Sequence, residues 1–172
     1  GLQSPRPNAG DSTRMEHLGG TFPIGEVFTE AKDFSQMNGS FMVYALAGPD
    51  FAIKMHDPFR VDVESGVVVG WGENAPKDFV DVVASIKENE RPLIREIGLG
   101  LNRAITRERY VNDITAFERI LGMHLSMGEK HSVYKKEGIV THKARFHVDI
   151  FPVVTRATAG GGVIFEYGKY LF

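Results

Sequence analysis

The feature that most constrains the fold of this chain is a succession of short apolar runs separated by turn residues. Downstream of Gly20 these runs read SFMVYALA, FAIKMH, VVVGW, IREIGLGL, RFHVDIF and GVIFEY. Gly, Asn, Asp and Pro separate them, and MNGS is a typical turn signal. The runs have the length of strands, and they do not alternate with helices as in a doubly wound fold. The chain is therefore predicted to build mainly a β-sheet.

Two segments depart from the β pattern and favour helices. In residues 76–90, PKDFVDVVASIKENE, Pro76 suits the first helical turn. Four apolar side chains of this segment fall on one face at helical spacing: Phe79, Val82, Val83 and Ile86. A second, shorter helix is expected in residues 113–121, DITAFERIL. We therefore predict a β-dominated α+β fold, a curled or barrel-like sheet with one or two helices packed against it.

Length and composition bound the domain organisation and the class of protein. The 172 residues suit one domain with a sizeable core. Residues 1–18 are polar and rich in Pro, Gly and Ser, so we expect a flexible leader followed by a single domain over residues 19–172. The formal net charge is only −2 and the charges are interspersed, which argues against a nucleic-acid partner.

The apolar runs and the absence of cysteine narrow the location and the chemistry. No apolar run approaches the length of a membrane span, and no signal-peptide pattern is visible, so no membrane association and a cytoplasmic location are expected. The chain has no cysteine. Disulfides, thiol catalysis and cysteine-ligated zinc are therefore excluded.

One of the strand-like runs, ARFHVDIF, carries His147 and Asp149 two residues apart. The period of a strand places both side chains on one face, with their Cα atoms about 7 Å apart. Such a pair can bind one ion together, or the two side chains can form a hydrogen bond with each other. The alternative is that both residues occupy the solvent face of an edge strand and have no further role.

Three more polar residues interrupt apolar runs. Glu26 lies in TFPIGEVFTEA, Glu96 in IREIGLGLN and His124 in ILGMHLSMG. Burying a single carboxylate or imidazolium is costly unless it is paired or ligated. Taken singly, each residue is typical of a satisfied, half-buried polar group. Taken together with His147 and Asp149, they favour one shared metal site.

Four segments resemble, in order and local context, the catalytic-half motifs of thermophilic-type metallo-aminopeptidases, the bacterial aminopeptidase S and T family. They are GGTFPIGEVFTEA, REIGLGLN, ERILGMHLSMG and FHVDI. The resemblance extends from about Gly19 to the C-terminus. It implies that two divalent metals are ligated by Glu26, Glu96, His124, His147 and Asp149. It also implies that Glu96 is the bridging, catalytic carboxylate.

The chain also departs from that family. The resemblance covers only the catalytic half, which implies a truncated, stand-alone domain. The family has a tyrosine near the metals, seven residues beyond the first histidine. Here that position is His131, and Tyr134 is the nearest phenol. As a catalytic candidate, His131 would donate to a bound carbonyl oxygen or ligate metal; the alternative is a merely exposed loop residue.

The donor set leaves three functions open. Carboxylate and imidazole donors suit zinc first, with manganese or ferrous iron as alternatives. Two ions about 3.5–4 Å apart would support a free-standing aminopeptidase. His124, His147 and Asp149 alone also match the two-His-one-carboxylate set of non-haem Fe(II) ring-cleaving dioxygenases.

The third possibility is peptide binding. Truncated relatives of this peptidase half resemble small peptide-binding proteins of pathways for ribosomally made, modified peptides, of which the crocagin type is an example. A peptidase fold provides a groove for an extended chain. We therefore expect a homodimeric, metal-binding protein that acts on or presents a precursor peptide, with the aminopeptidase and the dioxygenase as alternatives.

Overall fold

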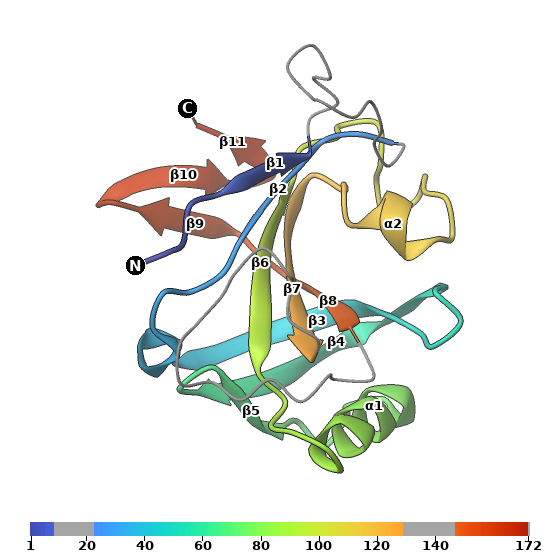
Figure 1. Ribbon diagram of the computed structural model, residues 1–172. Helices are drawn as coiled ribbons and strands as arrows, with labels where there is room; N and C mark the ends of the chain where they lie inside the picture. Colours follow the sequence, from blue (N-terminus) through green and yellow to red (C-terminus); the bar gives the residue numbers. More distant parts are fainter. Residues whose placement is uncertain (9–22, 129–146, 172) are drawn as a thin grey trace, which may run out of the picture.

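The computed structural model describes residues 1–8, 23–128 and 147–171. Within these residues, eight strands form one antiparallel sheet (Figure 1). In spatial order the strands are β1 (Arg6–Asn8), β2 (Glu26–Thr29), β6 (Ile94–Gly100), β7 (Gly122–Gly128), β8 (His147–Pro152), β3 (Gly39–Ala47), β4 (Ile53–Glu64) and β5 (Val67–Trp71). The strands β2, β6, β7 and β8 are consecutive neighbours, so the segments that carry the predicted ligands lie side by side.

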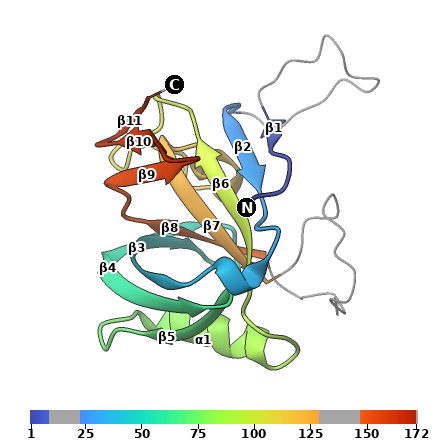
Figure 2. The same cartoon turned by 90° about the vertical axis from the view of Figure 1, so that its left-hand side faces the viewer.

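The sheet curls because β5 returns to the beginning of β6. An isolated bridge joins Val67 to Leu93, and the Ile94 amide donates to the Gly66 carbonyl at 2.8 Å. Figure 2 shows the resulting layout, in which β3, β4 and β5 form one half and β1, β2, β6 and β7 the other. The prediction of a curled, β-dominated α+β fold is confirmed.

A second, three-stranded antiparallel sheet follows β8 in the chain. It consists of β9 (Arg156–Ala159), β10 (Gly162–Glu166) and β11 (Lys169–Tyr170). The Tyr170 hydroxyl lies 2.7 Å from the Gly122 carbonyl oxygen and 3.1 Å from that of Gly100 and donates to this pair. Gly100 is the last residue of β6, and Gly122 is the first residue of β7. The Tyr170 hydroxyl therefore holds the small sheet against one end of the large sheet.

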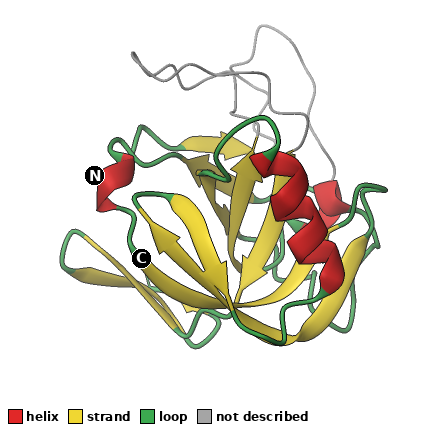
Figure 3. Ribbon diagram, turned by 90° about the horizontal axis from the view of Figure 1, so that it is seen from below, coloured by secondary structure: helices red, strands yellow, loops and turns green. Residues whose placement is uncertain are grey.

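Helix α1 (Lys77–Lys87) covers one face of the half formed by β3, β4 and β5 (Figure 3). Its buried residues Phe79, Val83 and Ile86 join a core with strand residues such as Phe59 and Val68. The predicted helix in residues 76–90 is thus confirmed, although it ends three residues earlier. Among the described residues, no helix combines the length and the apolar character that a membrane crossing needs.

Helix α2 (Ile114–Phe117) is much shorter than the predicted segment 113–121. The Asp113 carboxylate caps its first turn by accepting from the Thr115 amide. Beyond Phe117 the chain turns instead of continuing as a helix. The Arg119 carbonyl accepts from the Asn102 amide at 2.9 Å, so a tertiary contact takes the place of helical bonding there.

Strand β4 is longer than the predicted strand in residues 51–56 because a bulge accommodates Pro58. Val43 pairs with Phe59 and Ala45 pairs with Met55, so three residues of β4 face the single residue Tyr44. Proline lacks the amide that a regular ladder needs and is tolerated at bulges. The proline therefore bends the strand without ending it.

The first eight residues differ from the flexible leader that was expected over residues 1–18. Strand β1 pairs with β2, with Arg6 opposite Phe28, and the Gln3 amide donates to the Glu30 carbonyl at 2.8 Å. Polar composition suggested a leader, whereas backbone pairing with β2 needs no apolar side chains. Residues 9–18 lie outside the described residues, so that part of the leader stays a prediction.

Candidate metal centre

The candidate ligands lie on central strands. Strand β8 lies between β7 and β3, so the alternative of an edge strand is wrong. Asp149 is only 3% exposed, and both faces of β8 are covered. His147, at the beginning of β8, keeps a side chain that is 37% exposed. This strand therefore holds one carboxylate inside the protein and one imidazole at the surface.

Strand register sets the carboxylates in a row. Glu96 of β6 pairs with Ser126 of β7, and Ser126 pairs with Asp149 of β8. Directly paired residues of adjacent strands project their side chains from the same face. The Ser126 hydroxyl donates to Asp149 Oδ1 and lies 3.5 Å from Glu96 Oε1. One buried hydroxyl thus lies between two buried carboxylates.

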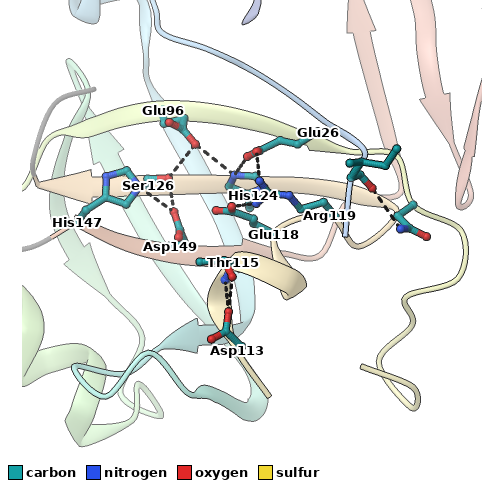
Figure 4. Close-up of polar contacts among 12 residues, drawn as sticks. Glu26, Glu96, Asp113, Thr115, Glu118, Arg119, His124, Ser126, His147 and Asp149 are labelled. Carbon is teal, nitrogen blue, oxygen red and sulfur yellow. Dashed lines mark hydrogen bonds and ion pairs between the residues drawn. The ribbon is translucent and has the colours of Figure 1, made fainter. Parts of the chain in front are cut away.

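His124 is the centre of the cluster. Its Nε2 lies 3.3 Å from Glu26 Oε1 and 3.3 Å from Glu96 Oε1 (Figure 4). The potential ligand atoms of Glu96, His124 and Asp149 all lie within 4.8 Å of one another. His147 extends the group, because its Nε2 lies 3.3 Å from Asp149 Oδ1.

The imidazole of His124 lies across Gly98 of β6, its direct partner in the sheet. A Cβ atom at position 98 would lie 2.0 Å from Cε1 and 2.1 Å from Nε2 of the His124 ring. The ring is 1% exposed and also packs against Phe151, with ring centroids 5.8 Å apart. The absence of a side chain at Gly98 is therefore what allows this ring position.

A second acidic group adjoins His124. The ligand atoms of Glu26, Glu118 and His124 also lie within 4.8 Å of one another. The buried Arg119 guanidinium lies 3.2 Å from Glu26 Oε2 and pairs with Glu118 as well. This group therefore carries its own cation. The Glu96 and Asp149 side of the cluster has no arginine or lysine partner among the described residues.

The cluster shifts the pKa values of its members. Burial lowers the pKa of His124, but hydrogen bonds with Glu26 and Glu96 and the charge of Asp149 raise it to about 10. Burial raises the pKa of Asp149, but the hydrogen bond and charge of His147, together with His124 and Ser126, bring it below its ordinary value. The metal-free cluster is therefore an anionic site that keeps a proton on His124.

The donor set fits a divalent cation. Four carboxylates, those of Glu26, Glu96, Glu118 and Asp149, face the single positive charges of Arg119 and protonated His124. Apart from the partly exposed imidazole of His147 beside Asp149, two negative charges are left without a buried cation in this cluster, and uncompensated buried charge is costly. Nε2 of an imidazole has a single lone pair, so His124 can bind one ion through this atom.

The cluster reaches a hollow of about 280 Å³. Glu118, His147 and Asp149 line one part of it. Apolar residues line the rest, including Ala47, Phe51, Val82, Ile114 and Val148. Because its lining joins carboxylates and an imidazole to apolar walls, this hollow can take a ligand that has both a polar group and an apolar side chain.

The arrangement of strands around this cluster is shared with a known structure. Wild-type AmpT from Thermus thermophilus, a thermophilic aminopeptidase, matches with a TM-score of 0.69. This chain has an AmpT-like fold. The match covers 98% of this chain but only 45% of AmpT, so the chain spans less than half of that protein's length. The identity is 16%, which supports a likeness of fold alone.

Comparisons of the sequence do not assign the chain to a protein family. No family model matches the chain, and no curated protein matches it either. The AmpT-like fold therefore supports the fold that the motifs implied, while the activity of AmpT does not transfer with it.

The predicted ligands are brought together, but their roles as ligands stay predictions. The five residues Glu26, Glu96, His124, His147 and Asp149 form one continuous cluster. The other catalytic candidate, His131, lies outside the described residues. Sequence reasoning missed Ser126, Glu118 and Arg119. For Glu118 and Arg119, the available sequence signal was that two charged residues stand next to each other directly before an apolar strand.

Proposed function

We propose that this chain is a divalent-metal-binding protein that uses its metal centre to bind a peptide. The observation that carries the proposal is the convergence of Glu96, His124 and Asp149 within 4.8 Å in a buried, negatively charged cluster. Zinc is the proposed ion because the donors combine imidazole and carboxylate without sulfur, with manganese and ferrous iron as alternatives.

The residues of the cluster have separate roles in this proposal. Glu96, His124 and Asp149 hold the ion, and Ser126 orients Asp149 through its hydroxyl. Arg119 holds Glu26 beside His124. A bound divalent ion supplies a Lewis acid that polarises a carbonyl oxygen and lowers the pKa of a ligated water.

The hollow beside the metal centre supports a peptide as the ligand. Glu118 and Asp149 offer acceptors for an amine, and His147 offers a partly exposed imidazole. Ala47 and Ile114 offer an apolar wall for a side chain. The AmpT-like fold, shared with an aminopeptidase, agrees with a ligand of this class.

The biological setting is a finer proposal. The resemblance to small proteins of modified-peptide pathways favours a precursor peptide of a ribosomally made natural product as the ligand. Association as a homodimer belongs to the same proposal. Sedimentation of the purified chain at tens of micromolar tests it, and a monomer there contradicts the dimer.

Metal binding is tested by thermal unfolding of chelator-treated protein with and without added zinc. At a free zinc concentration of 100 times Kd, the ion should add about 2.7 kcal/mol to the free energy of unfolding. For a chain of this size this corresponds to a rise in Tm of roughly 5–11 °C. His124→Ala should abolish the rise. His56→Ala is the matched control, because His56 pairs with Asp78 outside the cluster.

Peptide binding is tested by calorimetry with zinc-loaded and zinc-free protein and a peptide that carries apolar residues. We expect measurable affinity that falls when Asp149 is changed to Ala. An unchanged Tm on zinc addition would remove the metal from the proposal. Efficient turnover of amino-acid anilides would favour the aminopeptidase, and oxygen consumption with ferrous iron and a dihydroxylated ring the dioxygenase.

A further inference from the structure

A second, larger hollow lies at the end of the large sheet. Its volume is about 510 Å³, and it is bounded by residues 103–108, the beginning of β7 and the turn between β10 and β11. It shares no lining residue with the hollow at the metal centre. Its walls include the apolar side chains of Met123 and Phe165, and Tyr167 at its rim is 79% exposed.

Positive charge is concentrated on one side of this hollow. Residues 103–109 contain three arginines, Arg103, Arg107 and Arg109, and one acidic residue, Glu108. Arg103, Arg107 and Glu108 line the hollow, whereas Arg109 does not. The chain as a whole has a net charge of −2, so this short segment is locally opposite to the rest. Among the described residues, none of the three arginines forms an ion pair with a carboxylate. The positive charges of Arg103 and Arg107 are therefore available to an anionic ligand and exceed the single negative charge of Glu108 in the same lining.

Arg107 stacks on an aromatic ring in the wall of the hollow. Its guanidinium carbon lies 3.6 Å from the centroid of the Tyr44 ring, and both residues line the hollow. Tyr44 is only 7% exposed and packs against Phe151, so the ring is a firm support. A guanidinium stacked on an aromatic face keeps N–H donors along its edge, in a geometry that matches a carboxylate.

The segment that carries the arginines is folded on itself. The Thr106 amide donates to the Arg109 carbonyl at 2.9 Å, and the Thr106 hydroxyl accepts from the Arg109 amide at 3.0 Å. Arg109 Nε donates to the Ala104 carbonyl at 2.9 Å. These bonds order the backbone before any ligand arrives. A pre-ordered segment loses less conformational entropy when a ligand binds.

We propose that this hollow binds a carboxylate-bearing peptide. The carboxylate lies against Arg107 and Arg103, and an adjacent aromatic or large aliphatic side chain packs against Met123 and the exposed ring of Tyr167. The ligand class follows from the two kinds of wall, because the arginines require an anion and the apolar side chains require more than a small inorganic ion. The site is separate from the metal centre, and it rests on the proposed function only in taking a peptide as its ligand.

The carboxylate has two possible sources in a peptide, a side chain or the C-terminus. Three probes distinguish them: N-acetyl-Leu-Phe-Glu-amide, N-acetyl-Leu-Phe-Gln with a free C-terminus, and the neutral N-acetyl-Leu-Phe-Gln-amide. Calorimetry on the full chain, with and without zinc, gives the affinity for each. We expect at least one carboxylate peptide to bind about tenfold or more tightly than the neutral peptide. Added salt should reduce that difference.

Variants test the site itself. Arg107→Gln and, separately, Arg103→Gln should each weaken the carboxylate peptide by about fivefold or more while leaving the neutral peptide and zinc binding unchanged. Arg91→Gln is the matched control, because Arg91 is an exposed arginine outside the hollow. Equal affinity for the neutral peptide, or full affinity in both variants, overturns the proposal. Loss of zinc binding in His124→Ala with retained peptide affinity separates this site from the metal centre.

Discussion

Gly98→Ala is the substitution that most directly tests how the fold positions the metal centre. The new methyl group would lie about 2 Å from the His124 ring, far inside van der Waals contact. The His124 ring is buried between Glu26, Glu96 and Phe151. The clash can therefore be relieved only if the ring moves away from the two carboxylates. We therefore expect the variant to lose the position of Nε2 and, with it, tight zinc binding.

The expected change in folding free energy of the Gly98→Ala variant has two parts. Overpacking a tight site costs about 1–3 kcal/mol. Replacing glycine by alanine also lowers the conformational entropy of the unfolded chain, which stabilises the folded state by about 0.4–1 kcal/mol. The metal-free Gly98→Ala variant should therefore lose between about 0 and 2.5 kcal/mol of folding free energy. At zinc concentrations of 100 times Kd, it also lacks the roughly 2.7 kcal/mol of linked stabilisation, so the zinc-loaded proteins should differ by about 3–5 kcal/mol.

The assay is a pair of unfolding curves, with chelator and with zinc, together with calorimetric zinc titration. Gly70→Ala of β5 is the matched control, because a Cβ there meets only Asp62 at an ordinary distance of 3.5 Å. The control should keep the zinc-dependent rise in Tm. If Gly98→Ala keeps wild-type zinc affinity, the reasoning that ties the metal centre to the ring position of His124 is refuted.

Four further predictions concern the charged and polar groups of the cluster. Arg119→Met breaks a buried ion pair with Glu26 and should cost about 3–5 kcal/mol in chemical denaturation; a loss below about 1 kcal/mol would show that the pair is not structurally important. The pKa of His124 lies near 10 in the metal-free protein, so its stabilising effect should be complete below about pH 6.5 and decline as the pH rises towards 10. Zinc should then displace about one proton at pH 7, as calorimetry in buffers of different ionisation heat would reveal, and zero release argues against Nε2 as a ligand. Ser126→Ala removes the hydroxyl that donates to Asp149 and should destabilise the metal-free protein by about 1–3 kcal/mol; an unchanged denaturation midpoint speaks against that bond.

Much of the fold could be predicted from local patterns. The helical spacing of Phe79, Val83 and Ile86 predicted α1, because a helix face depends only on neighbours along the chain. The predicted second helix was too long, because the Arg119 carbonyl bonds to the Asn102 amide in another segment. The extension of β4 through Pro58 also escaped prediction, since the bulge that accommodates the proline requires β3 as a partner.

The sequence by itself determined the chemistry that the candidate site can offer: carboxylates and imidazoles, no sulfur, each placed within an apolar run that a sheet would bury. Only the tertiary structure decided which atoms meet. The order of β6, β7 and β8 and their register place Glu96, Ser126 and Asp149 in one row. The same pairing sets Gly98 beneath the ring of His124. Local pattern cannot specify these contacts, because a slip of one residue in any strand turns its side chains to the opposite face.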